Sequence, residues 1–284
     1  MSAAPRMPRL RPALLATTAL ASLAAIAPVA ATAYEPPPAN GGFDYQIGGD
    51  YPLPDGVGIV SRDWFSGSPA GGGTYSICYV NGFQTQADER GTDRPDEHGN
   101  WPRGLVLEKL GDDPNWGGEY LVDLRSADKR ERAARWVRQM IAGCAEQGYD
   151  AVEFDNLDSW TRFDGTPLAR RVPFGRREAV AYAELLTDSA HALDLAVAQK
   201  NTTQLSHRQS RERIGFDFAI AEQCGRYREC EAYRDLFGDL VIDVEYRRRD
   251  FRRACDQVGA ALSIVLRDIG VSRPGARTYR YDAC

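Results

Sequence analysis

Short apolar runs alternate along the chain with segments in which apolar residues recur at helical spacing. The eight runs cover residues 57–61, 75–80, 120–124, 151–154, 195–198, 216–221, 240–244 and 262–266. Near-continuous apolar runs of this length are typical of parallel strands buried on both faces. The clearest helical pattern spans 127–146, where Trp136, Met140 and Cys144 share one face, and 177–191 and 250–258 are similar. The pattern therefore predicts strands alternating with helices.

This alternation predicts a single α/β domain. Eight strands alternating with helices in roughly 250 residues fit a TIM-type (β/α)8 barrel, which we place at residues 43–284. The alternative is a doubly wound open sheet, which usually carries a Gly-rich phosphate loop after its first strand. The Ser-Arg-Asp-Trp sequence at 61–64 does not resemble such a loop. No internal repeat or break in composition marks a second domain.

The first 33 residues are expected to lie outside the fold. Arg6, Arg9 and Arg11 precede an uncharged apolar run at 13–30, and Ala-Thr-Ala at 31–33 fits a signal-peptidase site. We predict a secretory signal peptide over 1–33 and a Pro/Gly leader over 34–42. A membrane anchor is the alternative, but the small residues, a proline and the cleavage motif favour export and removal. The protein is then secreted and extracellular, without membrane attachment.

Composition excludes several classes of protein. The chain has 284 residues, with 43% apolar and 26% charged side chains, which excludes a largely disordered chain. Its formal charge is −5, and loss of the three arginines in residues 1–33, which contain no acids, would make it −8. An acidic balance argues against a nucleic-acid partner. We expect a monomer.

The six cysteines are expected to form disulfides in an oxidising compartment. Cys224 and Cys230 flank a short loop, and we predict a disulfide between them. The pairing of the other four cysteines stays open. A bond from Cys255 to Cys284 could hold the C-terminus, which would leave Cys78 and Cys144. A zinc site is disfavoured because His98, His191 and His207 show no metal-ligand spacing with the cysteines. We predict no metal and no cofactor.

Polar side chains end the predicted strands from residue 151 onward, where a TIM barrel carries its chemistry. They are Glu153, Asp155, Asn156 and Asp158; Lys200 and Asn201; Glu222; Asp243, Glu245 and Tyr246; and Arg267 and Asp268. Carboxylates inside apolar strands are costly unless they are paired or used. Strand alternation places Glu153 and Asp155 on one face, and Asp243 and Glu245 likewise share a face. Rim salt bridges and caps are the alternative for each residue alone, whereas the cluster favours a site.

The residue types favour acid/base chemistry by two carboxylates. No Gly-x-Ser-x-Gly elbow is present, and no histidine ends one of these strands. Six aromatic residues near strand ends suit stacking on sugar rings or ordinary loop packing: Trp64, Tyr79, Phe83, Trp160, Tyr227 and Tyr246. A cation site on Asp155, Asn156 and Asp158 is not predicted, because the glycine and final glutamate of a calcium loop are missing.

Residues 148–158, Gly-Tyr-Asp-Ala-Val-Glu-Phe-Asp-Asn-Leu-Asp, resemble the G-x-D-G-V-x-x-D-N-x-D signature of the endo-α-1,4-polygalactosaminidase family, glycoside hydrolase family 114. Further similar segments follow in the family's order at 45–49, 78–80, 200–201, 221–230 and 244–246. The resemblance covers nearly all of the mature chain. Its specific parts are D-N-x-D and the E-Q-C-x-x-Y-x-E-C sequence at 222–230.

The resemblance implies a TIM barrel that cleaves α-1,4-linked galactosamine polymers. Asp155 matches the proposed nucleophile or base, and Glu222 matches the proton donor. We expect these residues to bind substrate: Asp63, Tyr79, Asp123, Glu153, Asn156, Asp158, Lys200, Asn201, Tyr227, Asp243, Glu245, Tyr246 and Arg267. The sequence departs from the family at 81–86, where an S-x-G-x-x-E stretch with an acid is common and glutamine stands instead.

The acids at strand ends also predict the charge of the substrate. Asp123, Glu153, Asp158, Asp243, Glu245 and Asp268 are expected to ring the pocket, where they would attract an ammonium sugar and repel a polyuronate. Excess acid that merely keeps the protein soluble is the alternative. We predict a galactosamine-rich, cationic polysaccharide as substrate. A non-catalytic sugar-binding barrel is the second hypothesis, disfavoured because Asp155 and Glu222 are both present.

Overall fold

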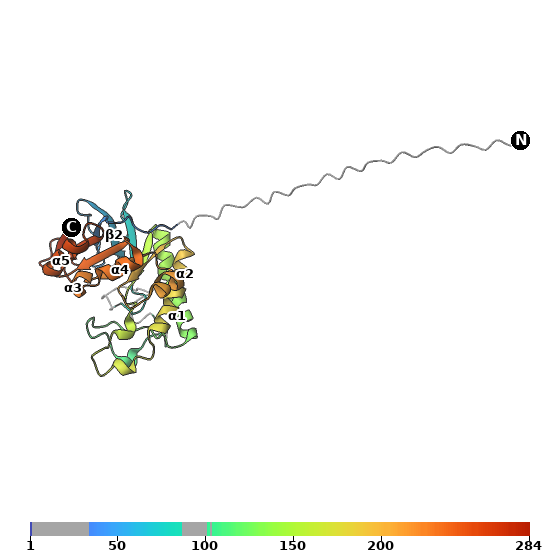
Figure 1. Ribbon diagram of the computed structural model, residues 1–284. Coiled ribbons are helices and arrows are strands. Elements are labelled where there is room, and N and C mark those ends of the chain that lie inside the picture. The colour runs from blue at the N-terminus through green and yellow to red at the C-terminus, as the bar shows by residue number, and fades with distance from the viewer. Residues whose placement is uncertain (2–33, 87–100, 103) are drawn as a thin grey trace. The chain divides into compact units, whose positions relative to one another are not determined.

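Eight parallel strands lie side by side in chain order, and a ninth strand pairs antiparallel to the eighth. The computed structural model describes residues 1, 34–86, 101–102 and 104–284 (Figure 1). The strands are β1 (Gly42–Tyr45), β2 (Val57–Asp63), β3 (Tyr75–Val80), β4 (Ala151–Phe154), β5 (Ala196–Lys200), β6 (Phe218–Glu222), β7 (Val241–Glu245), β8 (Ser263–Arg267) and β9 (Tyr281–Ala283). Together they form a nearly closed barrel, which confirms the predicted single-domain TIM-type fold.

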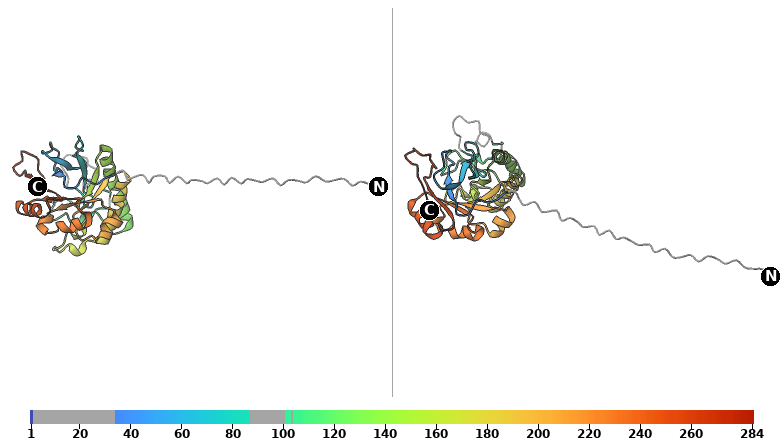
Figure 2. Two further views of the ribbon diagram at one scale, coloured as in Figure 1. Left: turned by 45° about the horizontal axis from the view of Figure 1, so that its top comes forward. Right: turned by 90° about the horizontal axis from the view of Figure 1, so that it is seen from above.

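Helices cover the outer side of the barrel (Figure 2). They are α1 (Ala127–Gln147), α2 (Arg176–His191), α3 (Cys224–Tyr227), α4 (Cys230–Phe237) and α5 (Arg248–Val258), with shorter turns at Glu108–Leu110, Ser159–Thr161, Ala169–Arg171 and Arg208–Ile214. The hydroxyl of Ser126 accepts from the amide of Lys129 at the start of α1, and Gly148 ends that helix at a φ of 88°. This left-handed turn, which glycine adopts without strain, leads directly into β4.

One predicted strand is wrong, and one barrel strand was missed. Residues 120–124 do not join the sheet; Leu121 and Val122 form only isolated bridges to Gln84 and Val106. Their apolar character comes from packing in the core outside the barrel. The first barrel strand is β1, which starts at the last residue of the predicted leader. Its four residues include a buried aspartate, so it lacks the continuous apolar pattern that identified the others.

Side-chain alternation divides the strands into two faces. The interior face is a cluster that includes Phe43, Ile77, Ala196, Phe218, Ile242, Val244 and Val265. The opposite face packs against the helices in a separate, larger core. Because neighbouring residues alternate, Glu153, Lys200 and Glu222 fall on the interior face, whereas Asp243 and Glu245 fall on the helix-facing side of β7. This difference separates the predicted site residues into two groups.

The seam between β1 and β8 is bridged by a side chain. No ladder pairs these two strands in the described residues. The guanidinium of Arg267, fully buried, donates to the carboxylate of Asp44 at 2.7 Å and to the carbonyl of Tyr45. Its other contacts are the carbonyls of Arg280 and Ser272, each at 3.0 Å. A buried ion pair with added hydrogen bonds thus joins the first and eighth strands.

All six cysteines are paired. Cys78 of β3 is bonded to Cys144 of α1, Cys224 to Cys230, and Cys255 of α5 to Cys284. The predicted bond between Cys224 and Cys230 is therefore confirmed. The bond from Cys255 to Cys284, one of the pairings left open by the sequence, holds the C-terminus. The predicted signal segment lies outside the described residues. Among the described residues, no helix has the length and apolar character needed to cross a membrane.

Candidate active site

A buried lysine stands among three carboxylates at the carboxyl end of the barrel. The ammonium nitrogen of Lys200, on β5, lies 3.3 Å from Glu153 Oε2, 3.3 Å from Asp155 Oδ1 and 3.7 Å from Glu222 Oε2. Burial alone would lower the pKa of Lys200, but the three acids raise it well above its ordinary value. The lysine is therefore a fixed positive charge shared by β4, β5 and β6.

Asp155 follows β4 and is held as a carboxylate. The hydroxyl of Tyr79, on β3, donates to Asp155 Oδ2 at 2.7 Å, and the backbone amide of Asn156 donates to Asp155 Oδ1 at 2.8 Å. Burial opposes ionisation, but Lys200, these two donors and Arg162 together lower the pKa of Asp155. Asp155 is consequently ionised and oriented at neutral pH.

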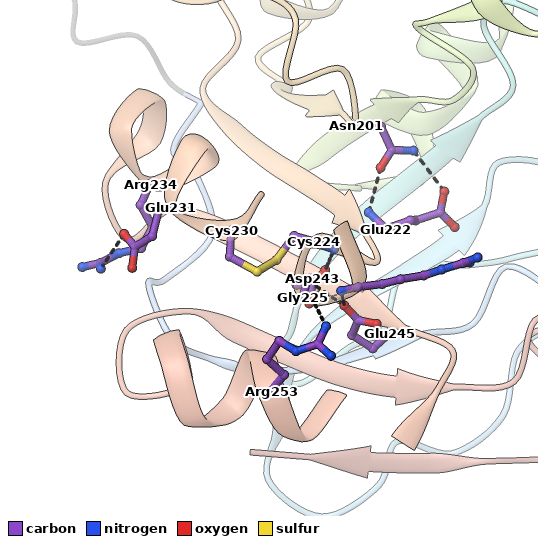
Figure 3. Close-up of a disulfide and its surroundings, with 11 residues drawn as sticks. Asn201, Glu222, Cys224, Gly225, Cys230, Glu231, Arg234, Asp243, Glu245 and Arg253 are labelled. Carbon is purple, nitrogen blue, oxygen red and sulfur yellow. Dashed lines mark hydrogen bonds and ion pairs between the residues drawn. A yellow bond between two sulfur atoms is a disulfide. The ribbon is translucent and has the colours of Figure 1, made fainter. Parts of the chain in front are cut away.

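Glu222 ends β6 and is held on both sides. The side-chain nitrogen of Asn201 donates to Glu222 Oε2 at 3.1 Å, and the side-chain oxygen of Asn201 accepts from the backbone amide of Glu222 at 2.7 Å (Figure 3). The hydroxyl of Tyr246, just after β7, donates to Oε1. A hydroxyl both donates and accepts, so Tyr246 can hold the Glu222 carboxyl in either protonation state.

Left-handed backbone turns follow three adjacent strands at this site. Asn156, Asn201 and Gln223 have φ values of 63°, 48° and 66° after β4, β5 and β6. Such conformations are uncommon for residues other than glycine and are found disproportionately at functional sites. Here they turn the chain immediately beside Asp155, Lys200 and Glu222.

Glu153 lies deeper in the barrel, below Asp155. Its carboxylate accepts from Ser61 and from the hydroxyl of Tyr45, which in turn accepts from Lys200 at 2.8 Å. Burial raises the pKa of Glu153, against the opposing effect of Lys200. The side chain is fully buried, so the structure places it beneath the pocket as support for Lys200.

Glu119 was not predicted, yet it belongs to this cluster. Its Oε2 accepts from Asn81 at 3.3 Å and from Gln84 at 3.5 Å. Burial, and then the charge of Asp155, raise its pKa to about 8. Asn81 and Gln84 belong to residues 81–86, where glutamine stands in place of the acid that is common in the family. Glu119, from a different loop, supplies a carboxyl beside this stretch. No local pattern around Glu119 reveals this, because the contact depends on the fold.

Asn156 connects Asp155 to a second group of polar residues. The side-chain amide nitrogen of Asn156 donates to Asn81 Oδ1 at 2.9 Å, and the side-chain oxygen of Asn156 accepts from Arg162. Arg162, also missed by the sequence analysis, pairs with Asp113 at 3.0 Å. Asp158 lies nearby and is partly exposed, and burial raises its pKa. Asn156 and Asp158 therefore lie beside Asp155, and their role in binding substrate stays a prediction.

Three other predicted site residues make contacts outside the Lys200 cluster. Asp63 ends β2 on the same face as Ser61 and accepts from the amides of Phe65 and Ser66 and from the side chain of Gln86. Asp123 pairs with Arg125 and Lys129, on a segment that is not a barrel strand. Tyr227 is 56% exposed at the end of α3. The role of these residues in binding substrate stays a prediction.

The acids of β7 and β8 also lie outside the pocket. Asp243 and Glu245 are fully buried and accept from backbone amides of α3. Arg267 closes the seam, and Asp268 accepts from Ser272 in the following loop. The structure therefore brings only part of the expected acidic ring together, and adds Glu119 to it.

The arrangement provides an ionised carboxylate after β4 and a second carboxyl at the end of β6, on either side of β5. Two carboxyls are the requirement for acid/base cleavage of a glycosidic bond. In the described part of the chain, one cluster has metal-ligand geometry: Cys224, Cys230 and Asp243. Both of its cysteines are in a disulfide, which leaves no thiolate to bind a metal.

Comparison with known proteins identifies the family of this chain. A sequence model described as glycoside-hydrolase family GH114 matches residues 24–283. Aspergillus fumigatus Ega3, solved in complex with galactosamine, superposes with a TM-score of 0.68 at 18% identity, over 87% of this chain and 96% of that one. The glycoside hydrolase domain of Pseudomonas aeruginosa PelA gives 0.55 at 14%, over 84% and 98%. No curated protein matches the sequence. The chain therefore belongs to glycoside hydrolase family GH114 and is a glycoside hydrolase.

Proposed function

We propose that this enzyme is secreted and cleaves α-1,4-linked galactosamine-containing polysaccharide with Asp155 and Glu222 as its two catalytic carboxyls. The observation that carries the proposal is the cluster around Lys200, in which one cation lies 3.3 Å from Asp155 and 3.7 Å from Glu222. Two carboxyls at such a site flank the bond to be cut.

Asp155 acts as the nucleophile. Its pKa is lowered, so it is negatively charged over the whole physiological range. Tyr79 and Asn156 fix its two oxygens, and the left-handed turn at Asn156 directs the chain away after it. A preorganised carboxylate of this kind attacks the anomeric carbon without reorganising its surroundings.

Glu222 acts as the general acid and then as the general base. Tyr246 and Asn201 hold its oxygens in place. The protonated form gives its proton to the glycosidic oxygen as the leaving group departs. The carboxylate then removes a proton from the water that releases the sugar.

The spacing favours retention of anomeric configuration. Lys200 Nζ lies 3.3 Å from Asp155 and 3.7 Å from Glu222, so these two oxygens are no more than about 7 Å apart. Retaining enzymes have carboxyls about 5–5.5 Å apart, and inverting enzymes roughly 6.5–9.5 Å. The limit of about 7 Å includes the whole retaining range and only the lower end of the inverting range, and on this ground we propose a double displacement through a covalent intermediate on Asp155.

The surroundings suit a sugar that carries an ammonium group. Glu119 and Asp158 lie close enough to Asp155 for its charge to raise the pKa of both acids. A bound ammonium would relieve this repulsion. The galactosamine in the Ega3 complex supports the same class of sugar for this chain. The three disulfides and the predicted signal peptide support secretion.

Two variants test the proposal. Asp155→Asn and Glu222→Gln should each lower release of oligosaccharides from polygalactosamine by at least about 10³-fold while the thermal unfolding temperature stays near that of the wild type. Asp239→Asn, at an exposed acid away from the pocket, is the control. Near-wild-type turnover in either variant would remove that residue from the mechanism. Retention of polymer without release by the wild type would indicate the binding protein instead.

A further inference from the structure

Two buried carboxyls lie behind the proton donor, on the helix-facing side of β7. Asp243 and Glu245 are fully buried, whereas Ile242 and Val244 of the same strand point into the barrel. They stand directly under the turn that follows Glu222 and contains the Cys224–Cys230 disulfide (Figure 3). The proposed mechanism does not use them.

One oxygen of each carboxyl is bound to the backbone of α3. Asp243 Oδ1 accepts from the amide of Cys224 at 3.0 Å. Glu245 Oε1 accepts from the amides of Gly225 and Arg226 at 2.8 and 3.1 Å. Each of the first three residues of α3 therefore donates its backbone N–H to this pair, and the turn cannot move without breaking these bonds.

The second oxygens are the unusual feature. Asp243 Oδ2 and Glu245 Oε2 are buried and have no donor among the described residues. The first oxygens of the two carboxyls bind the consecutive amides of Cys224 and Gly225, so the carboxyls lie side by side on one face of β7. Two carboxylates cannot hydrogen-bond to each other, but a carboxylic acid and a carboxylate can. A proton between these oxygens satisfies both.

The turn packs closely against its neighbours while these bonds are intact. A Cβ atom at Gly225 would lie 2.8 Å from the Cβ of Ala254 and 2.9 Å from Glu245 Oε1. Arg253 donates to the carbonyl of Gly225 at 2.8 Å while pairing with Asp250 at 3.1 Å. Gly225 is thus fixed at its amide by Glu245 and at its carbonyl by Arg253.

Strand β7 therefore holds the donor from two sides. On its outer face, Asp243 and Glu245 hold the turn that begins two residues after Glu222. Tyr246, directly after the strand, binds the Glu222 side chain. The amide of Gln223 also donates to the carbonyl of Val244 at 2.9 Å.

We propose that Asp243 and Glu245 share one proton, and that this protonated pair is a positioning device that keeps Glu222 in its catalytic place. The inference rests on the role proposed above for Glu222. Loss of the proton would leave two negative charges side by side in the protein interior, away from water. This repulsion strongly disfavours the arrangement in which both carboxyls bind the α3 turn. The α3 turn would then shift and take the donor with it, so the pair sets the alkaline limit of activity.

The surroundings are consistent with one proton on the Asp243 side. Burial, and then Glu245, raise the pKa of Asp243 well above its ordinary value. Burial also raises the pKa of Glu245, to about 7, while the amides of Arg226 and Gly225 oppose this. The other titratable groups that act on the pair are Glu222 and Tyr233 on Asp243, and Asp250 and Arg253 on Glu245.

The deciding experiment replaces the proton by an amide. Asp243→Asn keeps an oxygen for the Cys224 amide and donates permanently to Glu245. It should preserve kcat at pH 5–6 and shift the alkaline limb of kcat/KM upward by about one pH unit or more. Asp243→Leu, which loses both bonds, should lower kcat at every pH. Glu231→Gln, at an exposed acid beside the same disulfide, is the matched control and should leave the profile unchanged.

Two measurements separate this inference from the proposed function, because neither needs turnover. Infrared difference spectra on raising the pH should show loss of a protonated-carboxyl band that Asp243→Asn lacks. Unfolding temperatures of the wild type should fall through the same pH range, and those of Asp243→Asn should fall less. A wild-type spectrum without that band, or coincident alkaline limbs in wild type and Asp243→Asn, would overturn the proposal.

Discussion

Lys200 approaches Asp155 from inside the barrel, with its ammonium nitrogen 3.3 Å from the Asp155 carboxylate and no exposed surface of consequence. This contact contributes most to keeping Asp155 ionised, since burial alone would favour the neutral acid. A cation placed behind a nucleophile leaves the front of the carboxylate open to substrate.

Replacement of Lys200 tests this relationship. Lys200→Met should lower kcat about 10²-fold or more and move the acid limb of kcat/KM to higher pH, because Asp155 loses the cation that lowers its pKa. It should also cost about 3–5 kcal/mol of stability, because three carboxyls lose their partner. Lys109→Met, at an exposed lysine, is the control. An unchanged acid limb in a folded Lys200 variant would contradict this assignment.

Tyr246 is expected to act on the chemical step. Tyr246→Phe removes the hydroxyl that donates to Glu222 and keeps the ring. Its kcat should fall about 10–100-fold with a smaller change in KM, since the donor loses orientation in the transition state. Tyr75→Phe removes a hydroxyl that donates to the carbonyl of Glu35, at the start of β3 and away from the Lys200 cluster, and should behave as wild type. Steady-state kinetics on a defined oligomer distinguish these outcomes, and equal effects of the two substitutions would refute the role of Tyr246.

Glu119 should make stability depend on pH. Its pKa is about 8 in the folded protein, against about 4.3 in an unfolded chain. Between about pH 4.3 and pH 8 the folded state therefore holds a proton that the unfolded state releases, and the free energy of unfolding falls as pH rises through this range. Glu119→Gln cannot ionise, so its advantage over wild type should be near zero at pH 4 and reach about 5 kcal/mol at pH 9. Thermal melts at both pH values measure this, with the exposed Glu108→Gln as control; parallel wild-type and Glu119→Gln curves would contradict it.

Substrate charge should control the rate. We expect kcat/KM to be higher for deacetylated than for fully N-acetylated polymer, because the ionised Asp155 attracts ammonium groups, and a bound ammonium favours the ionised forms of Glu119 and Asp158. The difference should shrink as salt rises, since screening limits exposed charges to about 8 Å at physiological ionic strength. Initial rates on both polymers across a salt series provide the measurement. Equal rates without salt dependence would leave the two-carboxylate chemistry and remove the electrostatic preference.

The sequence predicted the barrel because most of its strands are apolar on both faces. It could not predict β1, whose four residues are stabilised by contacts with distant segments such as Arg267. Conversely, residues 120–124 have the apolar pattern of a strand but pack outside the sheet. Apolar pattern reports burial, and burial occurs in both places.

The same limit applies to the site. Asp155, Lys200, Asn201, Glu222 and Tyr246 follow strands directly, so their positions could be predicted from strand ends alone. Alternation also showed that Asp243 and Glu245 share a face, but not which face points inward. Glu119 and Arg162 reach the pocket from long loops, where sequence position carries no information about contact.

The bridge between Asp44 and Arg267 joins residues that are 223 positions apart in the chain. Closure of the barrel during synthesis from the N-terminus therefore has to wait until β8, the last of the eight parallel strands, has been made. Until then, β1 has one strand neighbour and its buried aspartate has no cation. Contacts between such distant segments form late and slow the folding of a domain. Once β1 and β8 meet, the first and last parallel strands share one ion pair, and the bond from Cys255 to Cys284 ties α5 to the end of β9, the neighbour of β8.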